Sequence, residues 1–347
     1  MAATVPADDN ILADAAARLA GGGVVAFPTE TVYGLGANAR NDDAVARIFA
    51  AKDRPSFNPL IVHVPDVATA RQYAQFNDLA ERVAETLWPG PLSIVLPRTE
   101  ASALSKLVSA GLDTVAVRIP ASPHARRLFA VAELPVAAPS ANKSNRLSPT
   151  EARHVADNFG EEVSLVLDGG PCTVGLESTV LDLSTDTPTL LRAGGTAQDA
   201  LEAVIGRPLV RAGTDDHSPK SPGMLSRHYA PRTPLRMNAT HAEDGGALLG
   251  FGAIDGTLNL SPSGDATEAA ANLFRYLHEL DAMNFTGIAV APIPEEGLGH
   301  AINDRKGGTS SAWTVAPAGS GARLEMELEL ELSLGFSGRQ SWGWSWK

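Results

Sequence analysis

The chain has 347 residues, of which 44% are hydrophobic and 20% charged, and its formal net charge is −12 at pH 7. This length is typical of two domains, and the composition is that of an ordinary soluble globular protein. A negatively charged surface repels phosphate polymers, so any anion site must be a local cluster of cations. The single cysteine, Cys172, excludes an intramolecular disulfide and a cysteine-rich zinc site, which is typical of a protein in a reducing cytoplasm.

No targeting or membrane segment is predicted. The first ten residues are acidic and lack the cationic region and apolar run of a signal peptide. No apolar stretch approaches the ~18 residues that a transmembrane helix needs. We therefore expect a cytoplasmic protein without a membrane partner.

Helical and strand patterns alternate through the first two hundred residues. Helical periodicity or helix-end signals predict helices over residues 11–20, 42–52, 68–73, 79–88, 124–131, 151–159 and 197–205. Short β-branched runs bounded by Gly, Pro or Asp predict strands over residues 24–29, 60–64, 92–97, 114–120, 164–170, 178–184 and 189–195. Several of these strands are close enough for hairpins, so the sheet is predicted to be mixed.

A change of composition divides the chain further along. Residues 211–234 are rich in Pro, Ser, Gly and charge without apolar periodicity, which is typical of a linker. A smaller αβ unit follows, with strands at 247–252 and 287–293, a helix over 267–280 and a helical start near 299–306. The predicted organisation is a larger α/β domain over 8–210, a linker over 211–234, a small αβ domain over 235–306 and a tail over 307–347.

The tail does not fit the rest of the chain. Its LEMELELELSLGF run alternates apolar and polar residues, which is compatible with an edge strand or with a foreign segment, and it ends in SWGWSWK. We expect it to be disordered and assign it no function.

The commonest functional motifs are absent. The sequence has no Gly-x-x-x-x-Gly-Lys-Ser/Thr loop, no strand-linked Gly-x-Gly-x-x-Gly, no His-Glu-x-x-His and no Gly-x-Ser-x-Gly. No histidine spacing suits a metal, so no metal ligands are predicted. A nucleotide would have to be bound in another way.

Two cations stand beside a rigid turn in the stretch AKDRPSFNPLIVHV, residues 51–64. Lys52 and Arg54 lie at the end of a predicted helix, where they would complement the helix dipole while facing solvent. Pro55 and Pro59 favour a different interpretation, because each proline fixes its own φ and restricts the preceding residue. Rigidly held cations at a strand edge suit a phosphate group.

Two more strand-end loops carry polar side chains. FPTETVYGLGANA (27–39) ends a buried strand in a hydroxyl- and glycine-rich turn, and VAAPSANKSNRLSPT (136–150) leaves an apolar strand for Ser140 and Asn142. Both are also compatible with plain connecting loops. Loops at strand ends are where α/β sheets place ligand groups, so three of them on one rim would suit a nucleoside triphosphate and a small polar substrate.

These stretches together resemble the YrdC-like threonylcarbamoyl-AMP synthases. The resemblance rests on PTETVYGLGANA, the Lys52-x-Arg54 pair with Asn58-Pro59-Leu60, and Ser140-x-Asn142, and it continues through TVAVRIP, GLESTV, LLRAGG and SPGMLSRHYAP. It covers roughly residues 8–305. It implies an α/β fold with a twisted mixed sheet and flanking helices around a concave basic cavity, plus a small C-terminal αβ domain.

The resemblance also implies a reaction and its partners. Family members condense L-threonine, bicarbonate and ATP into threonylcarbamoyl-AMP and release pyrophosphate, so they are nucleotidyltransferases. The product passes to a tRNA threonylcarbamoyl transferase complex, which modifies the adenosine beside the anticodon. Mg²⁺ is expected with ATP, held largely by phosphate oxygens and water. Weak binding of tRNA is a further possibility.

Site residues follow by position within the matching motifs. Lys52 and Arg54 are predicted to hold the triphosphate and to be catalytic, through a point charge and a bidentate fork respectively. The implied ATP contacts are Lys52, Arg54, Asn58, Thr114, Ser140, Asn142, Thr150, Arg192 and Tyr229. Tyr229 would let the linker reach over the nucleotide, or would merely fasten linker to domain.

Four further positions match residues that hold threonine in the family: Thr31, His63, Arg118 and Ser178. Arg118 would pair with the substrate carboxylate, although a cation in an apolar strand also suits a structural salt bridge. His63 is equally compatible with a satisfied core histidine.

Two other functions remain open at this point. A non-catalytic module could bind nucleotide or RNA in the same cavity, although the net charge of −12 disfavours RNA. A related carbamoyl-adenylate enzyme would use carbamoyl phosphate, but such proteins carry zinc fingers that a single cysteine excludes. After AINDR the sequence departs from the family pattern at Lys306, which puts the end of the small domain in doubt.

Overall fold

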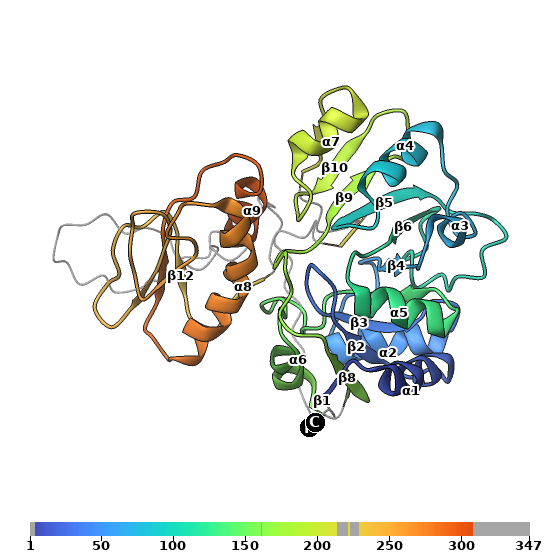
Figure 1. The fold of residues 1–347 in the computed structure, drawn as a ribbon, viewed down its shortest axis with the longest axis horizontal. Coiled ribbons are helices and arrows are strands. Elements are labelled where there is room, and N and C mark those ends of the chain that lie inside the picture. The colour runs from blue at the N-terminus through green and yellow to red at the C-terminus, as the bar shows by residue number, and fades with distance from the viewer. Residues whose placement is uncertain (1–3, 161, 214–220, 223–228, 308–347) are drawn as a thin grey trace, which may run out of the picture. The chain divides into compact units, whose positions relative to one another are not determined.

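The computed structural model describes residues 4–160, 162–213, 221–222 and 229–307 (Figure 1). Nearly all of the predicted tail and much of the predicted linker lie outside these residues. Within the described residues, no helix is long and apolar enough to cross a membrane.

One large mixed sheet dominates the first two hundred residues. In spatial order its strands are β1 (Thr4–Pro6), β8 (Leu165–Asp168), β2 (Val25–Phe27), β3 (Gly34–Asn38), β7 (Val136–Ala137), β4 (Ile61–His63), β6 (Thr114–Arg118), β5 (Leu92–Pro97), β9 (Thr179–Asp182), β10 (Thr189–Arg192) and β11 (Val210–Arg211). The sheet contains parallel pairs such as β4–β6 and antiparallel pairs such as β5–β6. The predicted α/β fold with a mixed sheet is confirmed.

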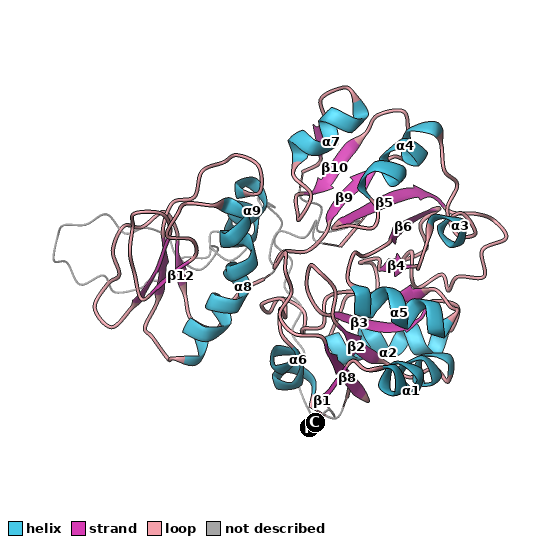
Figure 2. Ribbon diagram, viewed as in Figure 1, coloured by secondary structure: helices cyan, strands magenta, loops and turns pink. Residues whose placement is uncertain are grey.

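Helices flank this sheet (Figure 2). They are α1 (Asp9–Ala20), α2 (Asp42–Lys52), α3 (Val67–Ala70), α4 (Asp78–Leu87), α5 (Pro123–Ala132), α6 (Ala152–Phe159) and α7 (Gln198–Ile205). The bounds of α2 are those predicted from the sequence. Asn41 caps its first turn by accepting from the backbone N–H of Ala44, and Asp53 ends it in the left-handed conformation at φ 52°. This stop turns the chain sharply between Lys52 and Arg54.

Strand β3 corrects the interpretation of residues 27–39 as a polar turn. Its glycines make the sequence resemble a loop, but two of them are required by packing. A Cβ at Gly34 would lie 2.9 Å from the Phe27 ring, and one at Gly36 would lie 2.6 Å from it. Strand β2 pairs antiparallel with β3, so the glycines leave room for the buried Phe27 ring against one face of β3.

A second, four-stranded sheet forms within residues 229–307, which we call the small region. Its spatial order is β12 (Leu235–Arg236), β15 (Ile288–Val290), β13 (Ala247–Gly250) and β14 (Leu258–Asn259), and all pairs are parallel. Two helices accompany it, α8 (Ala266–Ala282) and α9 (Gly299–Gly307). Asp265 caps α8 by accepting from Thr267 and Glu268.

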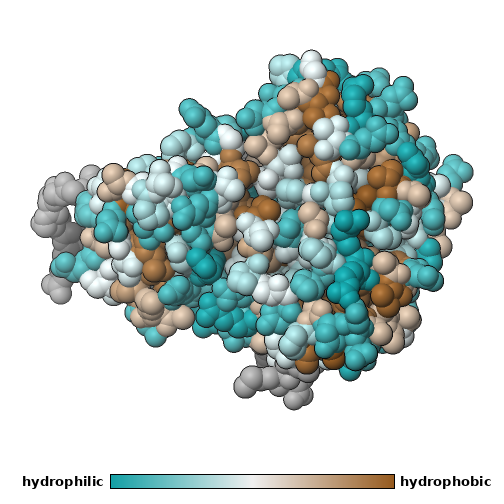
Figure 3. All heavy atoms as spheres, in the orientation of Figure 1, coloured by the Kyte–Doolittle hydropathy of each residue, from teal (hydrophilic) through white to brown (hydrophobic). Residues whose placement is uncertain are grey.

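The core of the small region extends to residues from the large sheet region. Val32, Leu147 and Leu176 belong to the same buried cluster as Leu273 and Phe274 of α8. On the molecular face in Figure 3, hydrophilic residues are interspersed with scattered apolar ones. The described large hydrophobic residues that are exposed are Phe57, Val131, Val210 and Met283.

Candidate active site

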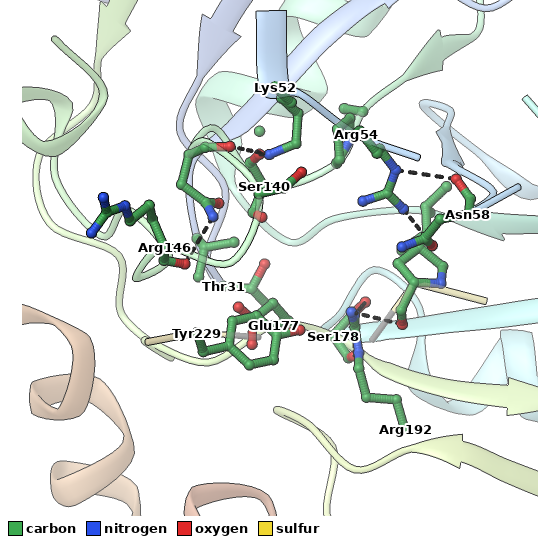
Figure 4. A pocket seen from close by; sticks show the side chains of 18 of the residues that line it. Thr31, Lys52, Arg54, Asn58, Ser140, Arg146, Glu177, Ser178, Arg192 and Tyr229 are labelled. Atoms are coloured by element: carbon green, nitrogen blue, oxygen red, sulfur yellow. Dashed lines mark hydrogen bonds between the residues drawn. The ribbon is translucent and has the colours of Figure 1, made fainter. Parts of the chain in front are cut away.

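A cavity of about 180 Å³ lies among the strand-end loops of the large sheet region (Figure 4). One water molecule needs about 10–15 Å³ of such volume, so the cavity is large enough for a small organic ligand. Its wall includes five cationic residues: Lys52, Arg54, Arg118, Arg146 and Arg192. The carboxylates in the wall are those of Asp53 and Glu177. The cavity is therefore basic, in contrast to the net charge of the chain.

The structure brings most of the predicted site residues together. Eleven of them line the cavity: Thr31, Lys52, Arg54, Asn58, His63, Arg118, Ser140, Asn142, Ser178, Arg192 and Tyr229. Two do not. Thr114 begins β6, and Thr150 is buried with its hydroxyl unpartnered among the described residues.

Lys52 is held by neutral oxygens. The side chain is only 2% exposed, and Nζ donates to the backbone carbonyls of Ser140, at 2.6 Å, and Asn142. Burial, reinforced by the positive charges of Arg54 and Lys143, holds the pKa of Lys52 well below its usual value. An anion placed beside Nζ would favour the charged ammonium and reverse this shift.

Arg54 is fixed by the turn that follows it. Nη2 donates to Oδ1 of Asn58 at 2.6 Å and to the carbonyl of Pro59 at 2.7 Å, while Nε donates to the carbonyl of Asn58 at 3.1 Å. Burial lowers the pKa of Arg54 to about 10. The rigid turn thus orients the guanidinium, as the two prolines predict.

Arg118 has a carboxylate partner. Nη2 lies 2.6 Å from Oε1 of Glu30 in a buried ion pair, and Nη1 donates to Oγ1 of Thr31 at 2.9 Å. The structural salt bridge considered above is therefore present, while the same arginine also lines the cavity. The partner, Glu30, was not singled out in the sequence, although it stands next to Thr31.

His63 lies beside Arg118 in the neighbouring strand. Its Nδ1 is 3.2 Å from the carbonyl of Ile61, so the ring is a partnered core histidine that also faces the cavity. Burial, and then the charge of Arg118, lower the pKa of His63 to about 3. The imidazole is therefore neutral at pH 7.

Arg192 and Ser178 connect two neighbouring strands at the site. Arg192 Nη2 donates to the carbonyl of Ser178 at 2.7 Å and to its Oγ at 3.1 Å, while Ser178 Oγ is 2.8 Å from Ser93 Oγ. Arg192 Nη1 also donates to the carbonyl of Pro222 at 3.2 Å, which ties a residue of the predicted linker to the cavity wall.

A buried carboxylate that sequence reasoning missed lies between these groups (Figure 4). Glu177 accepts from Ser148 Oγ, and its Oε2 is 2.6 Å from Nε of Arg305, whose side chain is fully buried. Burial favours the neutral acid, but Arg305 and Arg192 outweigh it and hold the pKa of Glu177 below its usual value. Glu177 belongs to the GLESTV motif, whereas nothing in the sequence connects it to α9.

Tyr229 and Arg146 complete the labelled wall. The guanidinium carbon of Arg305 lies 5.0 Å from the centroid of the Tyr229 ring, and burial raises the pKa of the Tyr229 hydroxyl. Arg146 extends away from the other labelled side chains in Figure 4. Within the described residues, no group of three His, Cys, Asp or Glu side chains could hold a metal ion.

A mixed sheet whose strand-end loops enclose a small, cation-lined cavity defines a YrdC-like α/β protein. A family model described as "Telomere recombination" (Sua5_yciO_yrdC) matches residues 17–194, and one described as "Threonylcarbamoyl-AMP synthase, C-terminal domain" matches residues 196–306. The chain belongs to the Sua5/YrdC family of threonylcarbamoyl-AMP synthases.

Relatives and solved structures agree with this assignment. A threonylcarbamoyl-AMP synthase of Pyrococcus abyssi is 40% identical over 82% of this chain and 89% of its own length. One of Bacillus subtilis is 42% identical over 86% of this chain and 92% of its own length. The crystal structure of P. abyssi Sua5 complexed with L-threonine has a TM-score of 0.81 at 37% identity, covering 89% of this chain and 97% of that one.

A more distant structure shares the fold alone. Escherichia coli YciO matches with a TM-score of 0.51 at 23% identity, covering 56% of this chain and 96% of its own. The YrdC-like prediction made from the sequence motifs is confirmed.

Proposed function

We propose that this chain synthesises threonylcarbamoyl-AMP from L-threonine, bicarbonate and ATP, with release of pyrophosphate. The observation that carries the proposal is a pair of cations, the buried Lys52 and the partly buried Arg54, which line the cavity and whose hydrogen bonds go to neutral oxygens. Buried charges without a counterion are costly, and a triphosphate would supply that counterion. The names of the relatives support the same product, and the threonine complex of the P. abyssi protein supports L-threonine as a substrate.

The reaction requires two bond-forming steps. Bicarbonate takes up a proton and loses water to give CO₂. The threonine ammonium loses one proton to become the attacking amine and a second proton once its nitrogen has bonded to the carbon of CO₂, which gives a carbamate. A carbamate oxygen then attacks the α-phosphorus of ATP, and the bond to the β-phosphate oxygen breaks to release pyrophosphate. Overall, the ammonium form of threonine, bicarbonate and ATP give the adenylate, pyrophosphate, water and one proton.

The protein would contribute mainly position and charge. Lys52 and Arg54 would neutralise the triphosphate as pyrophosphate leaves. Arg118, already fixed by Glu30 and Thr31, would pair with the threonine carboxylate, and neutral His63 would accept or donate a hydrogen bond without adding charge. Ser178, directly before β9, and Arg192, at the end of the neighbouring β10, would also face the substrate.

Mg²⁺ would accompany ATP as its counterion. The two carboxylates in the wall offer few ligands, because Glu177 already binds Arg305 and Ser148. The ion would therefore take most of its ligands from phosphate oxygens and water. The adenylate would serve a tRNA threonylcarbamoyl transferase complex as the group donor for modification of the adenosine beside the anticodon.

The test follows pyrophosphate release and detects the adenylate by mass spectrometry. The purified chain is mixed with ATP, L-threonine, bicarbonate and Mg²⁺, with threonine omitted in one control and Lys52→Ala/Arg54→Ala as the second. Threonine-dependent adenylate that disappears in the double variant is the expected result. ATP or RNA binding without threonine-dependent turnover would overturn the proposal in favour of a non-catalytic binding module.

A further inference from the structure

A short segment behind the cavity, residues 148–150, supports two parts of its wall. Ser148 Oγ donates to Glu177 Oε1, and the carbonyl of Pro149 accepts from the backbone N–H of Tyr33 at 2.8 Å. Glu177 lines the cavity and directly precedes Ser178. Tyr33 lies between Val32 and Gly34, which also line it, and two residues after Thr31. The position of this segment therefore affects both predicted threonine contacts, Thr31 and Ser178.

Two histidines hold the segment. His154, in the first turn of α6, accepts from the backbone N–H of Thr150 through Nδ1 at 3.3 Å. His278, from α8 of the small region, donates through Nε2 to the carbonyl of Ser148 at 3.1 Å. The two rings stack on each other, with centroids 3.8 Å apart and planes 15° apart. One ring from each region thus contacts the same three-residue segment.

These hydrogen bonds define the protonation of one nitrogen in each ring. Only an unprotonated Nδ1 can accept from Thr150, and only a protonated Nε2 can donate to the Ser148 carbonyl. Burial, and then the neighbouring imidazole and Arg153, lower the pKa of His154 to about 3, and burial also lowers the pKa of His278. The charged groups that act on the pair are Arg153, Asp157 and Asp281. At neutral pH, two uncharged rings can therefore stack without repulsion.

We propose that His154 and His278 form a two-histidine clamp that positions residues 148–150, and through them the threonine-binding wall of the cavity. Helix α8 then contributes to the active site, although none of its described side chains lines the cavity. Its effect on substrate rests on the proposed function. The clamp depends on particular ring nitrogens, whereas simple packing between the two regions would depend on shape alone.

Amide side chains distinguish these two roles. Asn places its oxygen near the position of Nδ1, and Gln places its nitrogen near that of Nε2. His154→Asn therefore keeps the acceptor for Thr150, and His154→Gln does not. Conversely, His278→Gln keeps the donor to Ser148, and His278→Asn does not. His241→Gln, at an exposed histidine of the small region, is the matched control.

Calorimetric titration with L-threonine and, separately, with Mg·ATP measures the effect on the site. His154→Gln and His278→Asn are expected to weaken L-threonine binding about tenfold, while ATP binding stays within about twofold. Lys52 and Arg54 are not attached to the segment, and Thr150, although predicted as an ATP contact, does not line the cavity. His154→Asn, His278→Gln and His241→Gln are expected to bind both ligands as the unmodified chain does. Equal effects of Asn and Gln at either position, or equal losses for both ligands, would overturn the clamp.

Hydrogen exchange of the Thr150 amide tests the clamp without any ligand. Faster exchange in His154→Gln than in His154→Asn is expected, and unchanged exchange in both would overturn the proposal. If the unmodified chain fails to bind threonine, the proposed function is wrong, whereas the exchange measurement still decides whether the histidines hold the segment.

Discussion

The cations in the cavity wall are held in two different ways. Arg118 is paired with the carboxylate of Glu30. Lys52 and Arg54 instead donate to carbonyl and amide oxygens, which carry no net charge. The charge of Arg118 is compensated before any ligand binds, whereas Lys52 and Arg54 have no such counterion. The difference indicates that Arg118 serves mainly to orient a ligand, and that Lys52 and Arg54 serve to bind negative charge.

The largest effect is expected from breaking the compensated pair. Arg118→Met leaves the buried carboxylate of Glu30 alone, which should lower the free energy of unfolding by about 3–5 kcal/mol. Denaturant unfolding of the variant measures this. The double variant Arg118→Met/Glu30→Gln should recover most of the stability without recovering threonine binding. A single variant as stable as the unmodified chain would show that the ion pair has no structural role.

Lys52→Met should affect activity much more than stability. Removing a buried ammonium without a counterion removes its desolvation cost, but it also leaves the Ser140 and Asn142 carbonyls without this donor. Because the two effects oppose each other, the free energy of unfolding should change by less than about 2 kcal/mol. Loss of charge stabilisation at the leaving pyrophosphate should lower kcat/KM for ATP about 10²–10³-fold. Steady-state pyrophosphate release and denaturant unfolding test both halves. Strong destabilisation would mean that Lys52 is a structural residue.

The buried His63, which lies beside Arg118, makes the stability of the fold depend on pH. The pKa of His63 is lowered to about 3 by burial and by Arg118, against about 6.5 in an unfolded chain. Below pH 6.5 the unfolded state binds a proton that the folded state does not, so stability decreases as pH falls. As pH falls from 7.5 to 5, this effect of His63 should lower the free energy of unfolding by roughly 2 kcal/mol. Most carboxylates remain ionised over this range.

Unfolding free energies at the two pH values measure this loss. His63→Gln should remove that share of the decrease, while His241→Gln, which alters an exposed histidine, should not. An unchanged pH dependence in His63→Gln would show that the folded protein accepts the proton at His63 without penalty.

The smallest effect is expected at a paired cation outside the cavity. Lys143 lies 2.6 Å from Glu162 in a partly exposed ion pair. Lys143→Gln should change the free energy of unfolding by less than about 1 kcal/mol, and the change should shrink further in high salt. Measurement at low and at high ionic strength tests this. If Lys143→Gln lowered the free energy of unfolding as much as Arg118→Met does, the cost of breaking an ion pair here would not depend on its burial.

The sequence was most informative where local chemistry is strong. Helix α2 was predicted with its observed bounds from an aspartate near its start and the inward apolar residues, although the residue that caps it is Asn41. The three strand-end loops were predicted to meet, and the cavity contains side chains from each of them. Strand β3 was missed because Gly34 and Gly36 resemble a turn until the Phe27 ring that they accommodate is seen.

Long-range partners could not be predicted in this way. Glu30 stands within a quoted motif, but its pairing with Arg118 depends on a contact between residues 88 positions apart. Arg305 and Glu177 are separated by even more of the sequence, and the helix of Arg305 shows no motif that would connect it to the cavity. The stacking of His154 on His278 likewise joins two helices whose sequences indicate only that each is amphipathic. These pairs are set by tertiary packing, which the local sequence pattern does not predict.

The buried pair of Glu177 and Arg305 has a consequence for how the protein is made. The two residues are 128 positions apart, and Arg305 is close to the end of the described chain. At a synthesis rate of about 5–20 residues per second, Glu177 leaves the ribosome roughly 6–26 seconds before its partner. During this interval the nascent site carries an unmatched carboxylate among its cations. The cavity wall is therefore completed late in translation, after the sheet that forms most of it has emerged.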